Sequence, residues 1–281
     1  RQTGTLPDRL SDRPLFHVDI DASELEHVRI PGARSIHCPV ATMLDSLVQG
    51  PALTSTDFSG WVAEIVAQKQ ILPLQDRGTS PGVSPDELLG CIDRLTVGMN
   101  TAVVTGVGSH QQWAARHFTY NAPNKLLFTS AGHGTMGYSL PVALGVKRLQ
   151  PERLVISVDG DGSFQMNLQE LAMIVDLKIP LKILVMDNNR LGIVSQFQKI
   201  TFADDPVTGV FHNPDFIRIA EAYGVKAWDL AAMDESTVAA WLNEPGPALL
   251  RAHIQHDAPV SPMLLGGQAL EAMWYAEDTQ K

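Results

Sequence analysis

In the larger, C-terminal part of the chain, uninterrupted apolar runs alternate with segments of helical periodicity. The strand-like runs are residues 101–108, 125–130, 153–161, 181–189, 225–230 and 248–254. Because apolar and polar positions do not alternate within them, these runs are typical of parallel strands buried on both faces. Helices are predicted between them, including residues 166–177 and 214–224. The pattern predicts an α/β fold built on a parallel sheet.

The remainder of the chain is less regular. Residues 13–49 form a short α/β segment, with a strand in "PLFHVDID" and a helix in "VATMLDSLV", which we interpret as the end of a domain that begins before Arg1. Residues 50–83 hold one helical stretch, "FSGWVAEIVAQKQ", between flanks rich in Pro, Gly, Ser and Thr, and are predicted to be a linker. We therefore expect three parts, namely residues 1–49, 50–83 and 84–281.

The third part is predicted to open on the helix in "VSPDELLGCIDRL". Ser84 is a candidate N-cap, Pro85 stands at the first helical position, and Glu87 completes a capping box.

Composition excludes several classes of partner. The formal net charge of −10, from 21 basic and 31 acidic residues, leaves no basic stripe, so no nucleic-acid partner is expected. No apolar run approaches the roughly 20 residues that a membrane span needs, so no membrane partner is expected. Cys38 and Cys91 lie far apart without a C-x-x-C pair, which favours free thiols in a reducing, cytoplasmic compartment.

A glycine motif follows the strand candidate 125–130. Gly132, Gly134 and Gly137 in "SAGHGTMG" fit G-x-G-x-x-G between a strand and a helix, which is the context of the dinucleotide fingerprint. A nicotinamide or flavin site is therefore one hypothesis.

The ends of three other strands favour a different ligand. "TGVGSHQQ", "VDGDGSFQMN" and "VMDNNRLG" place small or oxygen-bearing residues where a parallel sheet binds ligands. Asp161 offers a carboxylate, and an asparagine 27 or 28 positions later offers an amide oxygen, which suit Mg²⁺. Gly162 and Ser163 are predicted to open a helix whose N–H groups face a phosphate. Together these residues indicate a diphosphate held through a metal ion, which a dinucleotide site does not need.

These motifs resemble a known family. "GDGSFQMNLQEL" followed by "VMDNN" is similar to the thiamine diphosphate motif, a GDG turn followed further along the chain by NN. "TGVGSHQQWAA", "SAGHGTMGYSLPVALG", "LGIVSQFQ" and "SPMLLGGQALEAMW" resemble, in order, the catalytic subunit of acetohydroxyacid synthase, also called acetolactate synthase. The resemblance covers nearly the whole chain. It implies a parallel-sheet thiamine diphosphate-binding domain, preceded by the tail of a middle α/β domain.

The resemblance also implies roles for individual residues. The carbonyl of Gly134 would accept from the 4′-amino group of the cofactor, Met136 would wedge beneath the bent cofactor, and Phe197 would line the acceptor pocket. Gly132 and Gly137 would allow close approach of the backbone. The implied metal ligands are Asp161, Asn188 and the carbonyl of Arg190. The implied cofactor-binding residues are Ser109, His110, Gly134, Met136, Gly160, Asp161, Gly162, Ser163, Asn188, Arg190, Leu191, Gly192 and Ile193.

Two departures from the family pattern leave alternatives open. The chain has one residue fewer between its second asparagine and Gly192 than the family usually has. A gapless fit makes Asn188 the ligand, whereas a bulge in the strand would make it Asn189. Phe197 replaces a tryptophan of biosynthetic members, which weakens an assignment to branched-chain amino acid synthesis and leaves the acceptor open.

Other expectations concern segments around this site. Residues 199–212 are either a surface loop or a lid over the cofactor. Asp19, Asp21 and Glu24 are either a cluster of acids at a strand end or contacts to FAD, which the family carries without redox use. The activating glutamate of the family lies in a pyrimidine domain supplied by a neighbouring subunit. The resemblance therefore implies a homo-oligomer, and it leaves a regulatory subunit open.

The function expected is that of a carboligase. It would decarboxylate pyruvate and add the two-carbon unit to a second 2-oxo acid, with thiamine diphosphate and Mg²⁺ as cofactors. The alternatives are a thiamine-dependent decarboxylase or acyltransferase with another acceptor, a non-catalytic module that binds the cofactor, and a nicotinamide-dependent dehydrogenase. Taken alone, the chain is expected to be almost inactive because it lacks the glutamate.

Overall fold

A computed structural model describes residues 14–27, 32–50, 57–71, 74, 76–202, 209–265 and 272–276. The chain divides into two compact units. The first comprises residues 1–74 and 262–275, and the second comprises residues 75–261 and 276–281. Among the described helices, none is long and apolar enough to cross a membrane.

The first unit contains the short α/β segment that the sequence predicts. Strand β1 (Phe16–Asp19) pairs in parallel with β2 (Arg34–His37). Three helices accompany them, namely α1 (Ala22–Glu26), α2 (Val40–Gln49) and α3 (Ser59–Ile71). The predicted strand in "PLFHVDID" and the predicted helices in "VATMLDSLV" and "FSGWVAEIVAQKQ" are confirmed.

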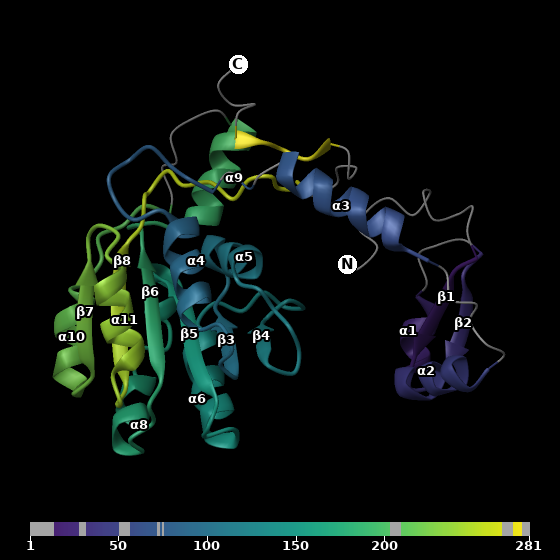
Figure 1. Cartoon of the computed structure of the whole chain (residues 1–281), viewed down its shortest axis with the longest axis horizontal. Helices are drawn as coiled ribbons and strands as arrows, with labels where there is room; N and C mark the ends of the chain where they lie inside the picture. Colours follow the sequence, from purple (N-terminus) through teal and green to yellow (C-terminus); the bar gives the residue numbers. More distant parts are fainter. Residues whose placement is uncertain are drawn as a thin grey trace. The chain divides into compact units, whose positions relative to one another are not determined.

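The second unit is built on a six-stranded sheet in which every neighbouring pair is parallel (Figure 1). The strands are β3 (Thr101–Thr105), β4 (Lys125–Thr129), β5 (Leu154–Gly160), β6 (Lys182–Asp187), β7 (Lys226–Leu230) and β8 (Ala248–His253). Their spatial order is β4-β3-β5-β6-β8-β7. All six strand predictions and the predicted α/β class are confirmed.

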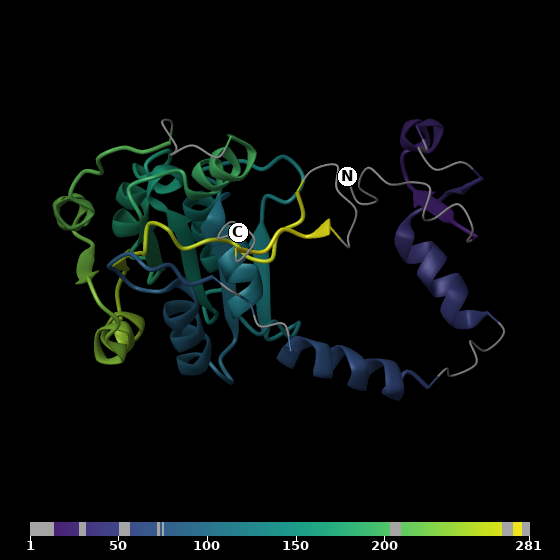
Figure 2. The same ribbon diagram turned by 90° about the horizontal axis from the view of Figure 1, so that it is seen from above.

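Helices cover both faces of this sheet (Figures 1 and 2). One apolar cluster joins it to α4 (Pro85–Leu95), α5 (Ser109–His117) and α11 (Glu235–Asn243). A second cluster joins the other face to α6 (Ser139–Leu149), α8 (Glu170–Asp176) and α10 (Phe216–Tyr223). Along β6, Leu184 and Met186 belong to the first cluster, and Ile183 and Val185 to the second. Burial on both faces explains why the strands are continuous apolar runs.

Two further helices begin at the carboxyl edge of the sheet. They are the short α7 (Asp161–Phe164) and α9 (Gly192–Phe202). Helix α10 shows clear end signals, because the side chain of Asp215 accepts from two N–H groups of its first turn and Gly224 follows its last residue with φ of 87°.

The predicted capping box of α4 is wrong, although Pro85 does occupy its first turn. The Ser84 hydroxyl contacts the side chain of Asp86 and caps no backbone N–H. Glu87 turns instead toward Arg77, with 3.1 Å between Oε1 and the guanidinium. Nearby charged partners therefore outcompete the backbone for both side chains.

The boundary between the units falls earlier than the predicted end of the linker. Val83 forms a parallel bridge beside Ile254, next to β8. Asp76 is 1% exposed. Its carboxylate accepts hydrogen bonds from Arg116 at 3.1 Å and from the backbone N–H of Ser261 at 2.9 Å. Its other oxygen lies 2.8 Å from Nε2 of His117. The described residues from Asp76 to Val83 are thus part of the second unit.

Asp76→Ala should lower the free energy of unfolding by about 3 kcal/mol, because it leaves the partly buried guanidinium of Arg116 and the buried N–H of Ser261 without their anion. Chemical denaturation measures this change. Arg77→Ala is the control, since Arg77 forms exposed ion pairs, and it should cost less than about 1 kcal/mol. Equal effects of the two substitutions would contradict the anchoring role of Asp76.

Candidate functional site

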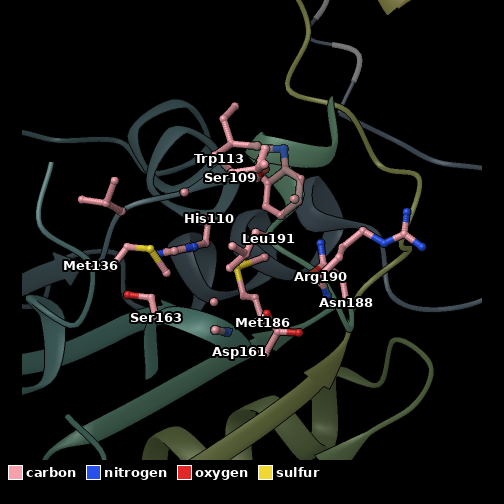
Figure 3. Close-up of a pocket in the computed structure, with 17 residues that line it drawn as sticks. Ser109, His110, Trp113, Met136, Asp161, Ser163, Met186, Asn188, Arg190 and Leu191 are labelled. Carbon is pink, nitrogen blue, oxygen red and sulfur yellow. Dashed lines mark hydrogen bonds between the residues drawn. The ribbon is translucent and has the colours of Figure 1, made fainter. Parts of the chain in front are cut away.

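A pocket lies at the carboxyl ends of β3, β5 and β6 (Figure 3). The chain leaves β3 for β4 on one side and later returns to β5 on the other, so the pocket lies at a topological switch point of the sheet. Of the predicted cofactor-binding residues, all but Gly134 line it. They are Ser109, His110, Met136, Gly160, Asp161, Gly162, Ser163, Asn188, Arg190, Leu191, Gly192 and Ile193.

One wall of the pocket is formed by His110 and the turn after β5. His110 is 5% exposed, and its Nε2 lies 3.3 Å from Oδ1 of the fully buried Asp159. A Cβ on Gly160 would lie 2.8 Å from Nδ1 of His110, so only glycine lets the histidine pack against this turn. Ser139 donates to the other oxygen of Asp159.

The glycine motif is tied to the same turn. The N–H of Gly137 donates to Oγ of Ser163 at 2.8 Å, and the Gly137 carbonyl accepts from Asn167 at 2.8 Å. A Cβ on Gly137 would lie 2.8 Å from Nδ2 of Asn167, so glycine is needed there for packing within the protein. A Cβ on Gly132 would meet no atom of the described residues within 4 Å, and the close approach to a cofactor predicted for both glycines stays a prediction.

Asp161 provides a buried carboxylate at the start of α7. It is 2% exposed, and among the described residues it forms no ion pair. Its Oδ1 accepts from the N–H of Gly162 at 2.8 Å and its Oδ2 from Nδ2 of Asn213 at 2.7 Å. Burial raises the pKa of Asp161 to about 6, and the hydrogen bond from Asn213 opposes this rise, whereas the nearby Asp187 carboxylate adds to it. A cation beside Asp161 would therefore offset a desolvation cost.

Asp187, by contrast, already has a cationic partner. Nε and one terminal nitrogen of Arg251 both lie 2.7 Å from its Oδ2. Its Oδ1 accepts from Nδ2 of Asn213 at 2.7 Å and from the N–H of Asn189 at 3.2 Å. Of Asp161 and Asp187, only Asp161 lines the pocket.

The turn after β6 distinguishes the two candidate asparagines. Asn188 is 9% exposed and lines the pocket together with Arg190, whose N–H lies 3.3 Å from Oδ1 of Asn188. Asn189 has φ of 55° and is not among the residues that line the pocket. This placement favours Asn188 as the ligand.

Two helices, α5 of 9 residues and α9 of 11 residues, begin at the pocket. Helix α5 begins at Ser109 and α9 at Gly192, and a Cβ on Gly192 would lie 2.9 Å from Oγ of Ser109 and 3.0 Å from Nδ2 of Asn188. The two N-termini therefore lie close together. Their unpaired N–H groups and dipoles favour an anion in the pocket.

Two predicted catalytic residues are not among those that line the pocket. Gly134 is exposed, with φ of 72°, and Val107 is the nearest side chain to a Cβ built on it, at 3.9 Å. Phe197 is 40% exposed on α9. Its neighbour Gln196 forms two hydrogen bonds of 2.9 Å with the backbone of Val260, which is a structural use of that helix face. The roles predicted for Gly134 and Phe197 stay predictions.

Two other predictions from the sequence concern the lid 199–212 and the acids Asp19, Asp21 and Glu24. Within the predicted lid 199–212, the end of α9 and residues 209–212 are described, and residues 203–208 lie outside the described part of the chain. Asp21 caps α1 by accepting from the N–H of Ser23, and Asp19 accepts from the N–H of Asp21 at 2.9 Å. These contacts support the interpretation of a strand-end cluster of acids.

Sequence reasoning missed several residues of the site. Asn213 and Arg251 come from segments far from the motifs, and neither has a spacing that points to Asp161 or Asp187. Trp113 and Met186 also line the pocket, but their sequence contexts are those of ordinary core residues. The strand-end rule could have found Arg251, since it lies on β8 beside β6.

The pocket residues fit a divalent ion and a diphosphate. Mg²⁺ prefers oxygen donors, and three are available here: the carboxylate of Asp161, the amide oxygen of Asn188 and the backbone carbonyl of Arg190. The remaining coordination positions of the ion would be left for phosphate oxygens and water. No cationic side chain in the described part of the chain pairs with Asp161, and the N-termini of α5 and α9 face the space beside it. Among the described residues, no cluster of three His, Cys, Asp or Glu forms a metal site. Such a site would therefore depend on one protein carboxylate and on the ligand.

Comparison with known proteins agrees with this geometry. Residues 106–252 match the family described as thiamine pyrophosphate enzyme, C-terminal TPP binding domain. The chain is 35% identical to acetolactate synthase 1, chloroplastic, of Oryza sativa subsp. japonica, over 97% of this chain and 44% of that protein. It is 37% identical to the mitochondrial acetolactate synthase catalytic subunit of Saccharomyces cerevisiae, over 76% of this chain and 32% of that protein. The chain thus spans less than half the length of these relatives, and the expected resemblance is confirmed.

The raised pKa of Asp161 predicts that this carboxylate opposes folding when no ion is bound. The group ionises near pH 3.8 when unfolded and near 6 when folded, so the cost develops between these values and is complete above pH 6. Asp161→Asn should therefore raise the free energy of unfolding by about 2 kcal/mol at about pH 7.5, and by much less at about pH 4.

Denaturation in the presence of a chelator measures this change. Asp257→Asn is the matched control with the opposite sign. Burial raises the pKa of Asp257, but hydrogen bonds from Ser80 and Thr79 outweigh burial and hold that pKa low, so this substitution should destabilise the protein. A loss of stability in Asp161→Asn at about pH 7.5 would contradict the assignment.

Proposed function

We propose that this chain, which belongs to the thiamine pyrophosphate enzyme family, holds the diphosphate and metal ion of a carboligase of the acetolactate synthase type. The observation that carries the proposal is the meeting of Asp161 and Asn188 in one pocket at the switch point of the sheet. The similarity to acetolactate synthases along 97% of the chain supports the reaction type.

In this proposal the metal ion is Mg²⁺, and three residues bind it. Asp161 contributes a carboxylate oxygen, Asn188 its amide oxygen and Arg190 its backbone carbonyl. The N-termini of α5 and α9 orient the diphosphate, and Ser109 and His110 donate to its oxygens. Bound thiamine diphosphate supplies the nucleophilic carbon and the electron sink that decarboxylation of a 2-oxo acid requires.

The remaining residues shape the space beside the diphosphate. Met136 lies on the same side of the pocket as His110 and Ser163 in Figure 3, and Asn188 and Arg190 lie on the other. In this proposal Met136 would support the cofactor, and the carbonyl of Gly134 would accept from its amino group. Apolar lining by Val107, Trp113 and Met186 helps to exclude water.

The whole protein is proposed to act on pyruvate and a second 2-oxo acid. Its activating glutamate would come from a pyrimidine domain of a neighbouring subunit, so that the active site is shared within a homo-oligomer. The proposal does not specify whether the whole protein binds FAD or a regulatory subunit. The second candidate function, a decarboxylase or acyltransferase with another acceptor, is favoured by Phe197 at the position where biosynthetic members carry tryptophan.

The two asparagines after β6 give a direct test of the metal site. Asn188→Ala should weaken Mg²⁺-dependent binding of thiamine diphosphate by about a hundredfold, because it removes an ion ligand. Asn189→Gly keeps the left-handed backbone and should leave affinity within about threefold. Calorimetric titration of the intact protein measures both. If Asn189→Gly weakened binding more than Asn188→Ala, Asn189 would be the ligand. Binding of thiamine diphosphate without any divalent ion would contradict the proposed metal site.

The acceptor is tested by analysing products from pyruvate alone and from pyruvate with 2-oxobutyrate. Formation of 2-acetohydroxy acids supports the carboligase, and acetaldehyde alone would favour the decarboxylase. Phe197→Trp should raise the share of product from 2-oxobutyrate severalfold, since a change of pocket shape is worth about 1 kcal/mol. Phe202→Trp, on the same helix and 70% exposed, is the control. An unchanged share in Phe197→Trp would remove Phe197 from the acceptor site.

A further inference from the structure

Asn213 is a polar residue of the site for which the sequence motifs give no role. Its single amide nitrogen donates to Oδ2 of Asp161 and to Oδ1 of Asp187, at 2.7 Å in each case. The side-chain NH₂ group has two hydrogens, and both are used here. Asn213 therefore joins two buried carboxylates at the carboxyl edge, those of Asp161 and Asp187.

The orientation of this amide is fixed by a third contact. Nε2 of Gln165 donates to Oδ1 of Asn213 at 3.1 Å. In the flipped orientation, the amide oxygen would face two carboxylates and the NH₂ group would face a donor. The two carboxylates and Gln165 together therefore hold the orientation in which Asn213 donates toward the acids.

Asn213 is also tied to the turn that carries the other proposed ligands. Val210 forms an antiparallel bridge with Arg190, and the N–H of Phe211 donates to the carbonyl of Asn189 at 3.1 Å. The ring of Phe211 packs against Gly162, where an added Cβ would lie 3.3 Å from Cζ. The described residues 209–213 therefore run as a strap along the turn after β6 and connect it to the start of α7.

The two acids that Asn213 joins differ in charge balance. Arg251 neutralises Asp187, whereas Asp161 has no cationic partner among the described residues. Without a donor between them, the two carboxylates would repel and the Asp161 side chain would turn away from Asp187. The Asn213 bond holds one oxygen of Asp161 in place and leaves lone pairs of the carboxylate for a ligand in the pocket.

We propose that Asn213 is a positioning residue, which orients the Asp161 carboxylate toward a divalent ion by tying it to the Asp187–Arg251 ion pair. This inference rests on the proposed function, because it takes Asp161 to be an ion ligand. Asn213 is not among the residues that line the pocket, so in this proposal it acts through Asp161. Loss of such an orienting partner typically weakens metal affinity by about 10- to 100-fold.

The test uses Mn²⁺ as a probe for the Mg²⁺ site in the intact protein. The dissociation constant of Mn²⁺ is measured by electron paramagnetic resonance in the presence of thiamine diphosphate, and no turnover is needed. Asn213→Leu keeps the size of the side chain and removes both donors, so it should raise this constant by about tenfold or more. The control is Gln111→Leu, which removes an amide bonded to Thr129 outside the pocket and should leave the constant unchanged.

A second variant keeps the test decisive if Asn213→Leu does not fold. Gln165→Leu leaves Asn213 in place but removes the donor to its amide oxygen, so the amide is held less firmly and the constant should rise by about threefold. If Asn213→Leu folds and its dissociation constant for Mn²⁺ is unchanged, the positioning role is overturned. If only Gln165→Leu folds, an unchanged constant in that variant overturns it. If the unsubstituted protein binds thiamine diphosphate without any divalent ion, the proposed function itself fails, and the two failures are thereby distinguished.

Discussion

Asp161 places a carboxylate in a buried position at the carboxyl end of β5, where no cationic side chain among the described residues neutralises it. Burial raises its pKa to about 6, so near neutral pH the carboxylate is ionised at a cost to folding. Retaining an unpaired buried acid makes physical sense when a cation completes the site. The charge balance at Asp161 is therefore the constraint that links the fold to a metal-held ligand.

The surrounding structure is consistent with that requirement. The parallel sheet brings the ends of β3, β5 and β6 to one edge, and two helix N-termini favour an anion beside the proposed ion. A second buried acid, Asp187, would compete for the ion if it were free. Its pairing with Arg251 and its bond from Asn213 leave Asp161 as the acid that faces the pocket.

Much of this architecture could be predicted from the sequence, because the strands are buried on both faces and therefore appear as uninterrupted apolar runs. The strand-end rule also indicated Asp161 and Ser109, and it left Asn188 and Asn189 as alternatives, between which the resemblance favoured Asn188. Helix ends were less predictable, since Ser84 and Glu87 were drawn to Asp86 and Arg77 instead of to the backbone. Asn213 was missed because its role depends on which distant segments meet, and no local pattern records that, whereas Arg251 lies on a predicted strand beside β6 and was within reach of the strand-end rule.

The most direct test is diffraction from crystals of the intact protein grown with Mn²⁺ and thiamine diphosphate. An anomalous peak is expected within bonding distance, about 2.2 Å, of a carboxylate oxygen of Asp161, the amide oxygen of Asn188 and the carbonyl oxygen of Arg190. A diphosphate should complete the coordination. A bound diphosphate in this pocket with no metal peak beside Asp161, or with the metal on Asp187, would contradict the account.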